Sequence, residues 1–108
     1  MKREDLTLPS SAEGHRLHAV VWSPDEEPRA VLQIAHGMSE HIGRYEALAR
    51  FLGDRGIAAV GHDHLGHGES VINERDLGFF ADGDASESVI RDMRAVTLEA
   101  KRHFPGLP

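Results

Sequence analysis

Apolar and polar residues alternate near the N-terminus of the chain. Leu6 and Leu8 are each flanked by polar residues, and residues 15–22 alternate again. Between these stretches, residues 12–14 (AEG) end in a glycine, which is typical of a turn. A period of two is the pattern of a strand with one buried face, so the chain is predicted to begin with an antiparallel hairpin.

A continuous apolar run follows a polar loop that is bounded by Pro24 and Pro28. Residues 30–35 (AVLQIA) are almost entirely apolar and lead into His36 and Gly37. A run of this kind is typical of a strand in a parallel sheet, so we expect a strand that is covered on both faces.

The spacing then becomes helical. Tyr45, Leu48 and residues 51–52 recur at intervals of three or four, and Gly53 and Gly56 offer stops. This pattern predicts a first crossover helix.

Residues 57–60 (IAAV) predict a second short strand, which ends in the glycine-rich segment 63–70 (DHLGHGES). The order strand, helix, strand indicates a βαβ unit.

A second helix is predicted from about Asp84, with Glu87 three residues on as in a capping box. Residues 101–103 (KRH) suit the negative end of a helix dipole, and residues 105–106 (PG) stop the helix. Its apolar face comprises Val89, Met93, Val96 and Ala100.

Composition narrows the class of protein. With 108 residues, 40% hydrophobic and 28% charged, the chain can form one packed domain. A net charge of −6 argues against nucleic acid as a partner. No apolar stretch reaches the roughly 20 residues of a membrane span, and no signal-peptide core follows the N-terminus, so we expect a cytoplasmic protein. The absence of cysteine excludes disulfides, thiolate catalysis and Cys-ligated zinc.

Residues 36–45 (HGMSEHIGRY) carry the first candidate chemistry. They lie between a predicted strand and a predicted helix, so their backbone N–H groups can point outward with the positive helix terminus behind them. This arrangement favours an anion, such as the tetrahedral oxygen that forms in acyl transfer.

The motif HGxxEHxxRY from His36 and the motif DxxGHGxS from Asp63 resemble those of monoacylglycerol lipases and the related bacterial lysophospholipases. The similarity continues through residues 104–108 (FPGLP) and covers nearly the whole chain. It implies an α/β fold, an incomplete α/β-hydrolase sheet with an antiparallel hairpin followed by parallel strands and crossover helices. Residues 1–108 would form the N-terminal portion of that domain and end before the nucleophile elbow.

In this family one oxyanion-hole donor comes from the strand-to-helix loop. Carried over residue by residue, it falls on the backbone N–H of Met38, with Gly37 allowing close approach and His36 bracing the loop. The group that the family keeps after this donor matches Glu40, His41, Arg44 and Tyr45. These four residues could brace the loop or position the substrate. A structural role at the start of the following helix is favoured over direct substrate contact.

The resemblance places the nucleophile, the acid and the catalytic histidine beyond Pro108, so no catalytic residue is expected in this chain. Ser39 and Ser70 each follow a Gly-x pair, but His41 and Ile72 stand where the second glycine of an elbow is needed. Neither serine is therefore predicted to be a nucleophile.

Residues 62–67 (HDHLGH) allow a metal interpretation, because closely spaced histidines with a carboxylate can ligate zinc. Gly66 stands where the similar metallo-β-lactamase pattern has an aspartate, and a turn in which Asp63 and Ser70 bond local backbone explains the segment better. We expect neither metal nor cofactor. For the remaining histidines, no spacing in the sequence indicates a partner residue. They are interpreted as surface or strand residues: His15, His18 and His103.

The function implied by the resemblance is hydrolysis of a lipid or small ester, a monoacylglycerol or lysophospholipid, through an acyl-serine intermediate. The parent protein would be the enzyme, and this chain alone would be inactive. The family strand order 1-2-4-3-5 leaves the strand at 30–35 without an outer neighbour, so we expect either a second polypeptide bearing the rest of the hydrolase or self-association through that strand. Two alternatives stay open, namely a non-catalytic fragment or interaction module and a metal-dependent hydrolase that uses residues 62–67.

Overall fold

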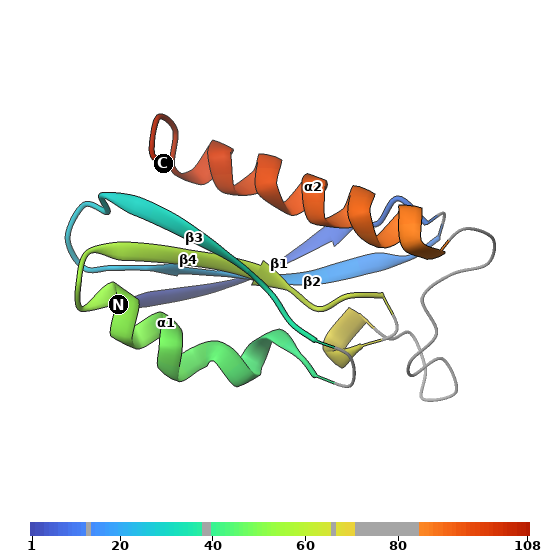
Figure 1. The fold of residues 1–108 in the computed structure, drawn as a ribbon, viewed down its shortest axis with the longest axis horizontal. Coiled ribbons are helices and arrows are strands. Elements are labelled where there is room, and N and C mark those ends of the chain that lie inside the picture. The colour runs from blue at the N-terminus through green and yellow to red at the C-terminus, as the bar shows by residue number, and fades with distance from the viewer. Residues whose placement is uncertain (13, 38–39, 66, 71–84) are drawn as a thin grey trace.

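A four-stranded sheet with helices on both faces forms the protein. The computed structural model describes residues 1–12, 14–37, 40–65, 67–70 and 85–108. Along the sheet the strands lie in the order β1 (Lys2–Pro9), β2 (Arg16–Ser23), β4 (Ile57–His62) and β3 (Ala30–Ala35). Helix α1 (Glu46–Gly53) lies on one side of the sheet and helix α2 (Ala85–His103) on the other (Figure 1). This is the predicted incomplete α/β sheet, and the first four positions of the expected strand order are confirmed.

The predicted hairpin is confirmed. β1 (Lys2–Pro9) pairs antiparallel with β2 (Arg16–Ser23), and their register places Leu6 opposite Ala19. Gly14 in the connection has φ +81°, a left-handed conformation that glycine adopts without steric cost.

The predicted βαβ unit is also confirmed. β3 (Ala30–Ala35) leads through a 3-10 turn, η1 (Ile42–Tyr45), into α1 (Glu46–Gly53), and the chain returns as β4 (Ile57–His62). β3 and β4 are parallel over their full length, and β4 also pairs antiparallel with β2. β4, which ends in His62, is therefore an inner strand with a neighbour on each side.

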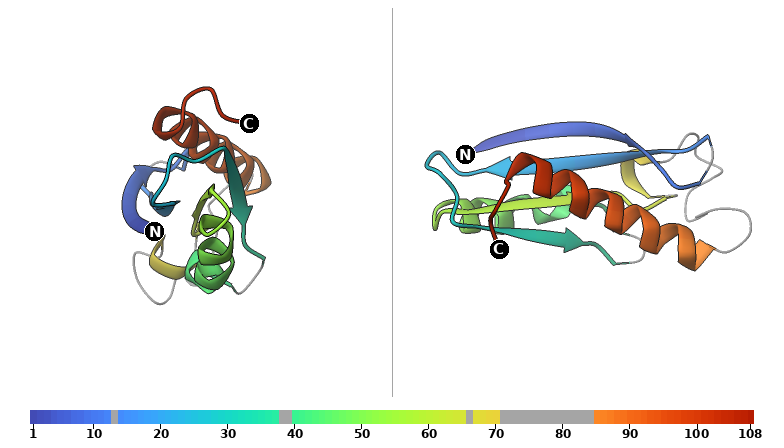
Figure 2. Two further views of the ribbon diagram at one scale, coloured as in Figure 1. Left: turned by 90° about the vertical axis from the view of Figure 1, so that its left-hand side faces the viewer. Right: turned by 90° about the horizontal axis from the view of Figure 1, so that it is seen from above.

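The helix α2 (Ala85–His103) lies along the opposite face of the sheet (Figure 2). The predicted apolar face is confirmed, because Val96 and Ala100 are buried while Val89 and Met93 are half-buried. The expected start near Asp84 lies outside the described residues. A second 3-10 turn, η2 (Gly68–Ser70), follows β4.

Each face of the sheet has its own core. On the α1 face, Trp22 and Ile34 pack with Ile42 and Ala49. On the α2 face, residues of β2 and β4 pack with Val96 and Ala100. No helix in the described part of the chain has the length and apolar character that crossing a membrane would require.

One expectation about burial is wrong. Leu32 is 43% exposed and Ala35 is exposed, although a strand covered on both faces was expected, because β3 is the terminal strand of the described sheet. In the first helix, Leu48 and Phe51 are exposed. The inner face of η1 and α1 instead comprises Ile42, Tyr45, Ala49 and Leu52.

The outer edge of β3 is not entirely bare. The N–H of Val31 donates to the carbonyl of Pro108 over 2.9 Å, so the end of the chain lies beside the first part of this strand. A groove of about 150 Å³ lies here between α2 and β3, with Gln33, Thr97 and Phe104 in its wall. The final residue thus covers part of the outer edge of β3.

Candidate functional site

Two loops meet at the carboxyl end of the parallel strands. Ala35 and His62 are paired as the last residues of β3 and β4, so the segments that follow them emerge side by side. These segments begin at His36 and at Asp63, which are the starting points of the two motifs. The βαβ geometry thus brings both motifs to one edge of the sheet, which is where ligands bind in open α/β sheets.

Glu40 braces the first loop. The N–H of Gly37 donates to Oε2 of Glu40 over 2.5 Å, and the hydroxyl of Tyr45 donates to the same oxygen over 3.1 Å. The bond from Gly37, followed by that from Tyr45, holds the pKa of Glu40 below its ordinary value. A Cβ at position 37 would lie 2.8 Å from this carboxylate oxygen, so a larger residue would displace the carboxylate that accepts from position 37.

His36 and His64 join the two loops. The backbone N–H of His64 donates to Nε2 of His36 over 2.9 Å, so Nδ1 of His36 carries the proton and donates to the carbonyl of Gly37 over 2.7 Å. Nε2 of His64 in turn donates to the carbonyl of His36 over 3.1 Å. The backbone at positions 36 and 37 is therefore held by both neighbouring loops.

Asp63 links the second loop to the start of η1. Its side chain is 2% exposed, with Oδ1 accepting from the N–H of Ile42 over 2.7 Å and Oδ2 accepting from the N–H of Glu69 over 3.0 Å. Burial acts to raise the pKa of Asp63, but the bonds from Ile42, His18 and Glu69 outweigh it and hold the pKa below its ordinary value. The carboxylate is thus ionised and fully used as an acceptor.

His18 lies on β2, so its interpretation as a strand residue is confirmed, but it has two partners that no pattern in the sequence indicates. Its Nδ1 lies 2.7 Å from Oδ2 of Asp63, and its Nε2 lies 2.7 Å from Oδ2 of Asp5. Sequence reasoning missed this residue because its partners are 13 and 45 positions away. The alternation of the hairpin shows only which face of β2 a residue occupies.

A family model of hydrolases, described as serine aminopeptidase, S33, matches residues 26–108. The chain belongs to this family. It is also 33% identical to the human monoglyceride lipase over 97% of its length, and 37% identical to a monoacylglycerol lipase of Mycolicibacterium smegmatis over 88%. The resemblance that the two motifs carry is therefore confirmed, and the chain spans about a third of the length of these relatives.

Solved structures give the same fold. A lipase in its open form superposes with a TM-score of 0.87 at 28% identity, covering 99% of this chain and 34% of that structure. A carboxyl esterase from Bacillus coagulans superposes with a TM-score of 0.90 at 24% identity, covering 100% and 34%. The α/β-hydrolase class of the sheet is thereby confirmed.

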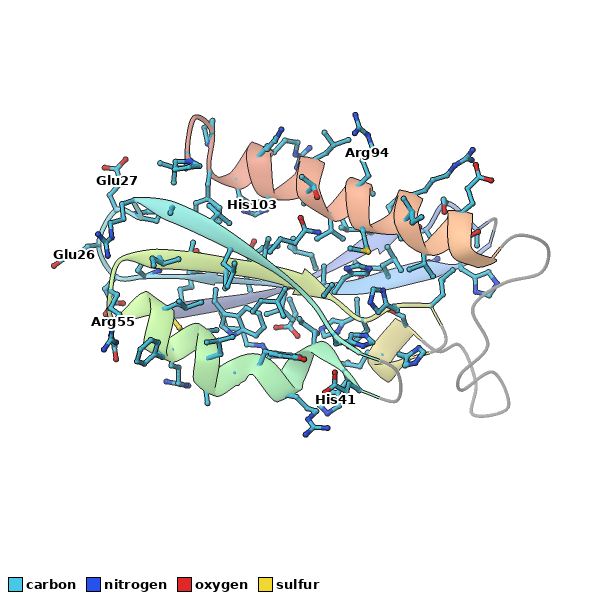
Figure 3. All side chains as sticks on the ribbon, viewed as in Figure 1. Glu26, Glu27, His41, Arg55, Arg94 and His103 are labelled. Atoms are coloured by element: carbon cyan, nitrogen blue, oxygen red, sulfur yellow. The ribbon has the colours of Figure 1, made fainter. Side chains whose placement is uncertain are left out.

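Several site residues of this hydrolase family remain untested by the structure. Met38, which carries the expected oxyanion donor, and Ser39 lie outside the described residues, as does Gly66. His41 and Arg44 are exposed at the start of η1, and Figure 3 shows His41 at the surface. A guanidinium nitrogen of Arg44 lies 3.7 Å from Oε1 of Glu40.

Ser70 serves the loop as a hydrogen-bonding residue. Its Oγ donates to the carbonyl of Asp63 over 2.7 Å and accepts from the N–H of His18 over 3.0 Å. The side chain is buried, and both bonds tie η2 to β2 and β4. This is the local bonding that the sequence predicted for Ser70, and it leaves the hydroxyl badly placed to attack a substrate.

The histidines of residues 62–67 do not converge as metal ligands. Nε2 of His64 and Nδ1 of His67 each bond a backbone carbonyl. In the described part of the chain, no three potential ligand atoms from this segment lie within 4.8 Å of one another. The geometry gives no support to a metal-dependent hydrolase that uses this segment.

His62 is the most enclosed of these histidines. It is fully buried at the end of β4, and among the described residues neither ring nitrogen has a hydrogen-bond partner. Burial, followed by the nearby rings of His64 and His36, lowers the pKa of His62 to about 4. The ring is therefore neutral at pH 7 and acts as part of the packing beneath both loops.

Proposed function

We propose that the whole protein is a serine ester hydrolase that acts on a monoacylglycerol or a lysophospholipid through an acyl-serine intermediate. Residues 1–108 form the N-terminal portion of its domain and supply the strand-to-helix loop of the oxyanion hole. Membership of the hydrolase family and the similarity to proteins named monoglyceride lipases support this proposal. The nucleophile, acid and catalytic histidine belong to the part of the relatives that this chain does not span.

The observation that carries the proposal is the bracing of the loop on both sides of the donor position. Before it, Gly37 is fixed through its N–H by Glu40 and through its carbonyl by His36. After it, Glu40 is held by Tyr45 at the end of η1. A donor that stabilises a developing oxyanion must be oriented before the reaction, and such bracing supplies that orientation for the N–H of Met38.

The proposal gives Glu40 and Tyr45 a bracing role. Both side chains are already bonded to the loop or to each other, so their polar atoms are engaged before substrate arrives. His41 and Arg44 are exposed at the mouth of the site, where Arg44 also lies 3.7 Å from Oε1 of Glu40, and both can reach a substrate head group. Substrate contact is therefore assigned to this second pair.

Complementation tests the proposed function. The chain is co-expressed with the remaining two-thirds of the Mycolicibacterium smegmatis monoacylglycerol lipase, and hydrolysis of 1-monooleoylglycerol and of lysophosphatidylcholine is measured together with fluorophosphonate labelling. We expect turnover and label on the second polypeptide only, and neither with the chain alone. Label on a serine of this chain would contradict the proposal.

A matched pair of variants controls that experiment. Glu40→Gln weakens the acceptor for Gly37, while Glu27→Gln changes an exposed carboxylate far from the loop (Figure 3). We expect the first to lower kcat in the complemented enzyme and the second to leave kcat unchanged.

A partner along β3 is also proposed. The strand is terminal in the described sheet, and on its outer edge the described hydrogen bond joins Val31, near its beginning, to Pro108. A second polypeptide that bears the rest of the hydrolase would continue this pairing, and a second copy of the chain would use the same edge. If the chain associates with the second polypeptide in the co-expression experiment but the pair hydrolyses no ester, the chain is instead an interaction module.

A further inference from the structure

Three potential metal ligands meet at a point separate from the oxyanion loop. Asp5 lies on β1, His18 on β2 and Glu69 in η2. One carboxylate oxygen of each acid and a ring nitrogen of His18 all lie within 4.8 Å of one another. Since these residues are far apart in sequence, only the folded sheet brings them together.

The orientation of the His18 ring is fixed from within the protein. Asp63 is buried and ionised, and its Oδ2 lies 2.7 Å from Nδ1 of His18. This nitrogen must therefore carry a proton and donate it. Nε2 is left facing outward, 2.7 Å from Oδ2 of Asp5 and 3.5 Å from Oε2 of Glu69.

A cation is needed at this point. If the ring is neutral, Nε2 presents a lone pair to two ionised carboxylates, and lone pairs held 2.7 Å apart repel each other. Either a proton or a metal ion on Nε2 removes that repulsion. Arg3 bonds both oxygens of Asp5 but donates to neither Glu69 nor His18 among the described contacts, so it does not fill the position.

The arrangement resembles a metal site in two respects. Histidines that bind metals usually donate their other N–H to a carboxylate, which is the role that Asp63 plays for His18. Tetrahedral zinc with bonds near 2.0–2.1 Å places its ligand atoms roughly 3.3 Å apart, close to the separation of His18 and Glu69. Asp5 must move outward by about half an ångström, which its half-exposed side chain permits.

The position is also open to solvent. A cavity of about 420 Å³ is lined by His18 and Glu69, together with Thr7, Arg16 and Ser70. Water can therefore reach the ion and complete its coordination. The carboxylates of Asp5, Glu69 and Asp63 gather here beside the guanidinium of Arg3, with Arg16 also in the cavity wall, and together they attract a cation.

We propose that Asp5, His18 and Glu69 bind a divalent transition metal ion of the zinc type, oriented by Asp63 behind the histidine. The ion would tie the first strand of the hairpin to the turn that follows β4. This inference concerns the chain's own residues and does not depend on ester hydrolysis.

Calorimetric titration of metal-free chain with ZnCl₂ at pH 7.5 tests the site. We expect one high-affinity ion per chain and at least a tenfold loss of affinity in His18→Gln and in Glu69→Gln. Glu69 is mostly exposed, so the second variant is expected to fold normally. Matched controls are His41→Gln and Glu27→Gln, which change exposed residues elsewhere and should leave the affinity unchanged (Figure 3).

X-ray absorption at the zinc edge provides an independent readout. The proposal requires one imidazole nitrogen with oxygen ligands in the first coordination shell. Absence of binding, binding that survives both His18→Gln and Glu69→Gln, or a shell of several imidazoles would overturn it. If no metal binds, a proton on Nε2 of His18 takes the place of the ion and is donated to Asp5.

Discussion

The backbone N–H of Ile42 donates to Oδ1 of Asp63 over 2.7 Å, joining the start of η1 to the end of β4. Ile42 is fully buried, and its side chain packs beneath the same junction. One carboxylate therefore fixes the helix that follows the first loop and, through Glu69, the turn that follows the second. The relative position of the two motifs depends on this residue.

Asp63→Ala should strongly destabilise the fold. The substitution leaves the buried N–H of Ile42 without its acceptor and removes the partner of His18, and losing one member of such a buried network typically costs about 3–5 kcal/mol. Urea denaturation followed by circular dichroism measures the change. Glu26→Ala, at an exposed position, is the control and should change the free energy of unfolding by less than about 0.5 kcal/mol. A small effect of Asp63→Ala would contradict this role.

Gly61→Ala should also be destabilising, for a steric reason. A Cβ at this position would lie 2.3 Å from Cδ1 of Ile42 and 2.8 Å from the carbonyl oxygen of Ile34. Overpacking of this kind typically costs about 1–3 kcal/mol. Adding Ile42→Val removes the nearer clash and should recover part of the loss in the same denaturation assay. If the double variant loses at least as much free energy of unfolding as the two single variants together, Ile42 is not the obstructing group.

Acid should destabilise the fold through His62. Its folded-state pKa is lowered from 6.5 to about 4, so the unfolded chain binds the proton more readily below pH 6.5. The neutral ring thus contributes stability that is complete above pH 6.5 and is lost as the pH falls toward 4, by about 3 kcal/mol in total. Denaturation between pH 7 and pH 4 should show this loss in the wild type and a smaller one in His62→Leu. Parallel pH profiles for the two proteins would be inconsistent with the account.

The exposed edge of β3 should make the isolated chain associate. Size-exclusion chromatography with light scattering is expected to find dimers or larger species, because a terminal strand with an exposed Leu32 offers unpaired backbone to another copy. Leu32→Lys should shift the population toward monomer. Leu48→Lys places the same charge at a similarly exposed position on α1 and should not. A wild-type chain that stays monomeric at high concentration would exclude self-association.

The sequence predicts the elements whose boundaries are set by local chemistry. The strand at 30–35 has the expected bounds because an apolar run is enclosed between a proline-bounded loop and a glycine. The inner face of α1 could not be predicted, because the exposed Leu48 and Phe51 are as apolar as the residues that are buried, and only the sheet decides which face of the helix points inward. Hydrophobicity alone does not select that face.

In the candidate site, too, local features could be predicted from the sequence and contacts between separate elements could not. His36, Gly37 and Glu40 lie within one motif and can be found by spacing. The contacts of His18 and of Asp63 with Ile42 connect separate elements, and one of them ends on a backbone N–H that carries no sequence signal. Such contacts become visible only once the strand order is known.

The most direct test of the central claim compares Met38→Pro with Met38→Leu in the complemented hydrolase. Proline removes the backbone N–H proposed as the oxyanion donor, whereas leucine keeps it and changes only the side chain. The account predicts a fall in kcat of about 10²–10³-fold for proline, in a pair that still assembles, and little change for leucine. Equal losses in the two variants, or full activity with proline, would contradict it.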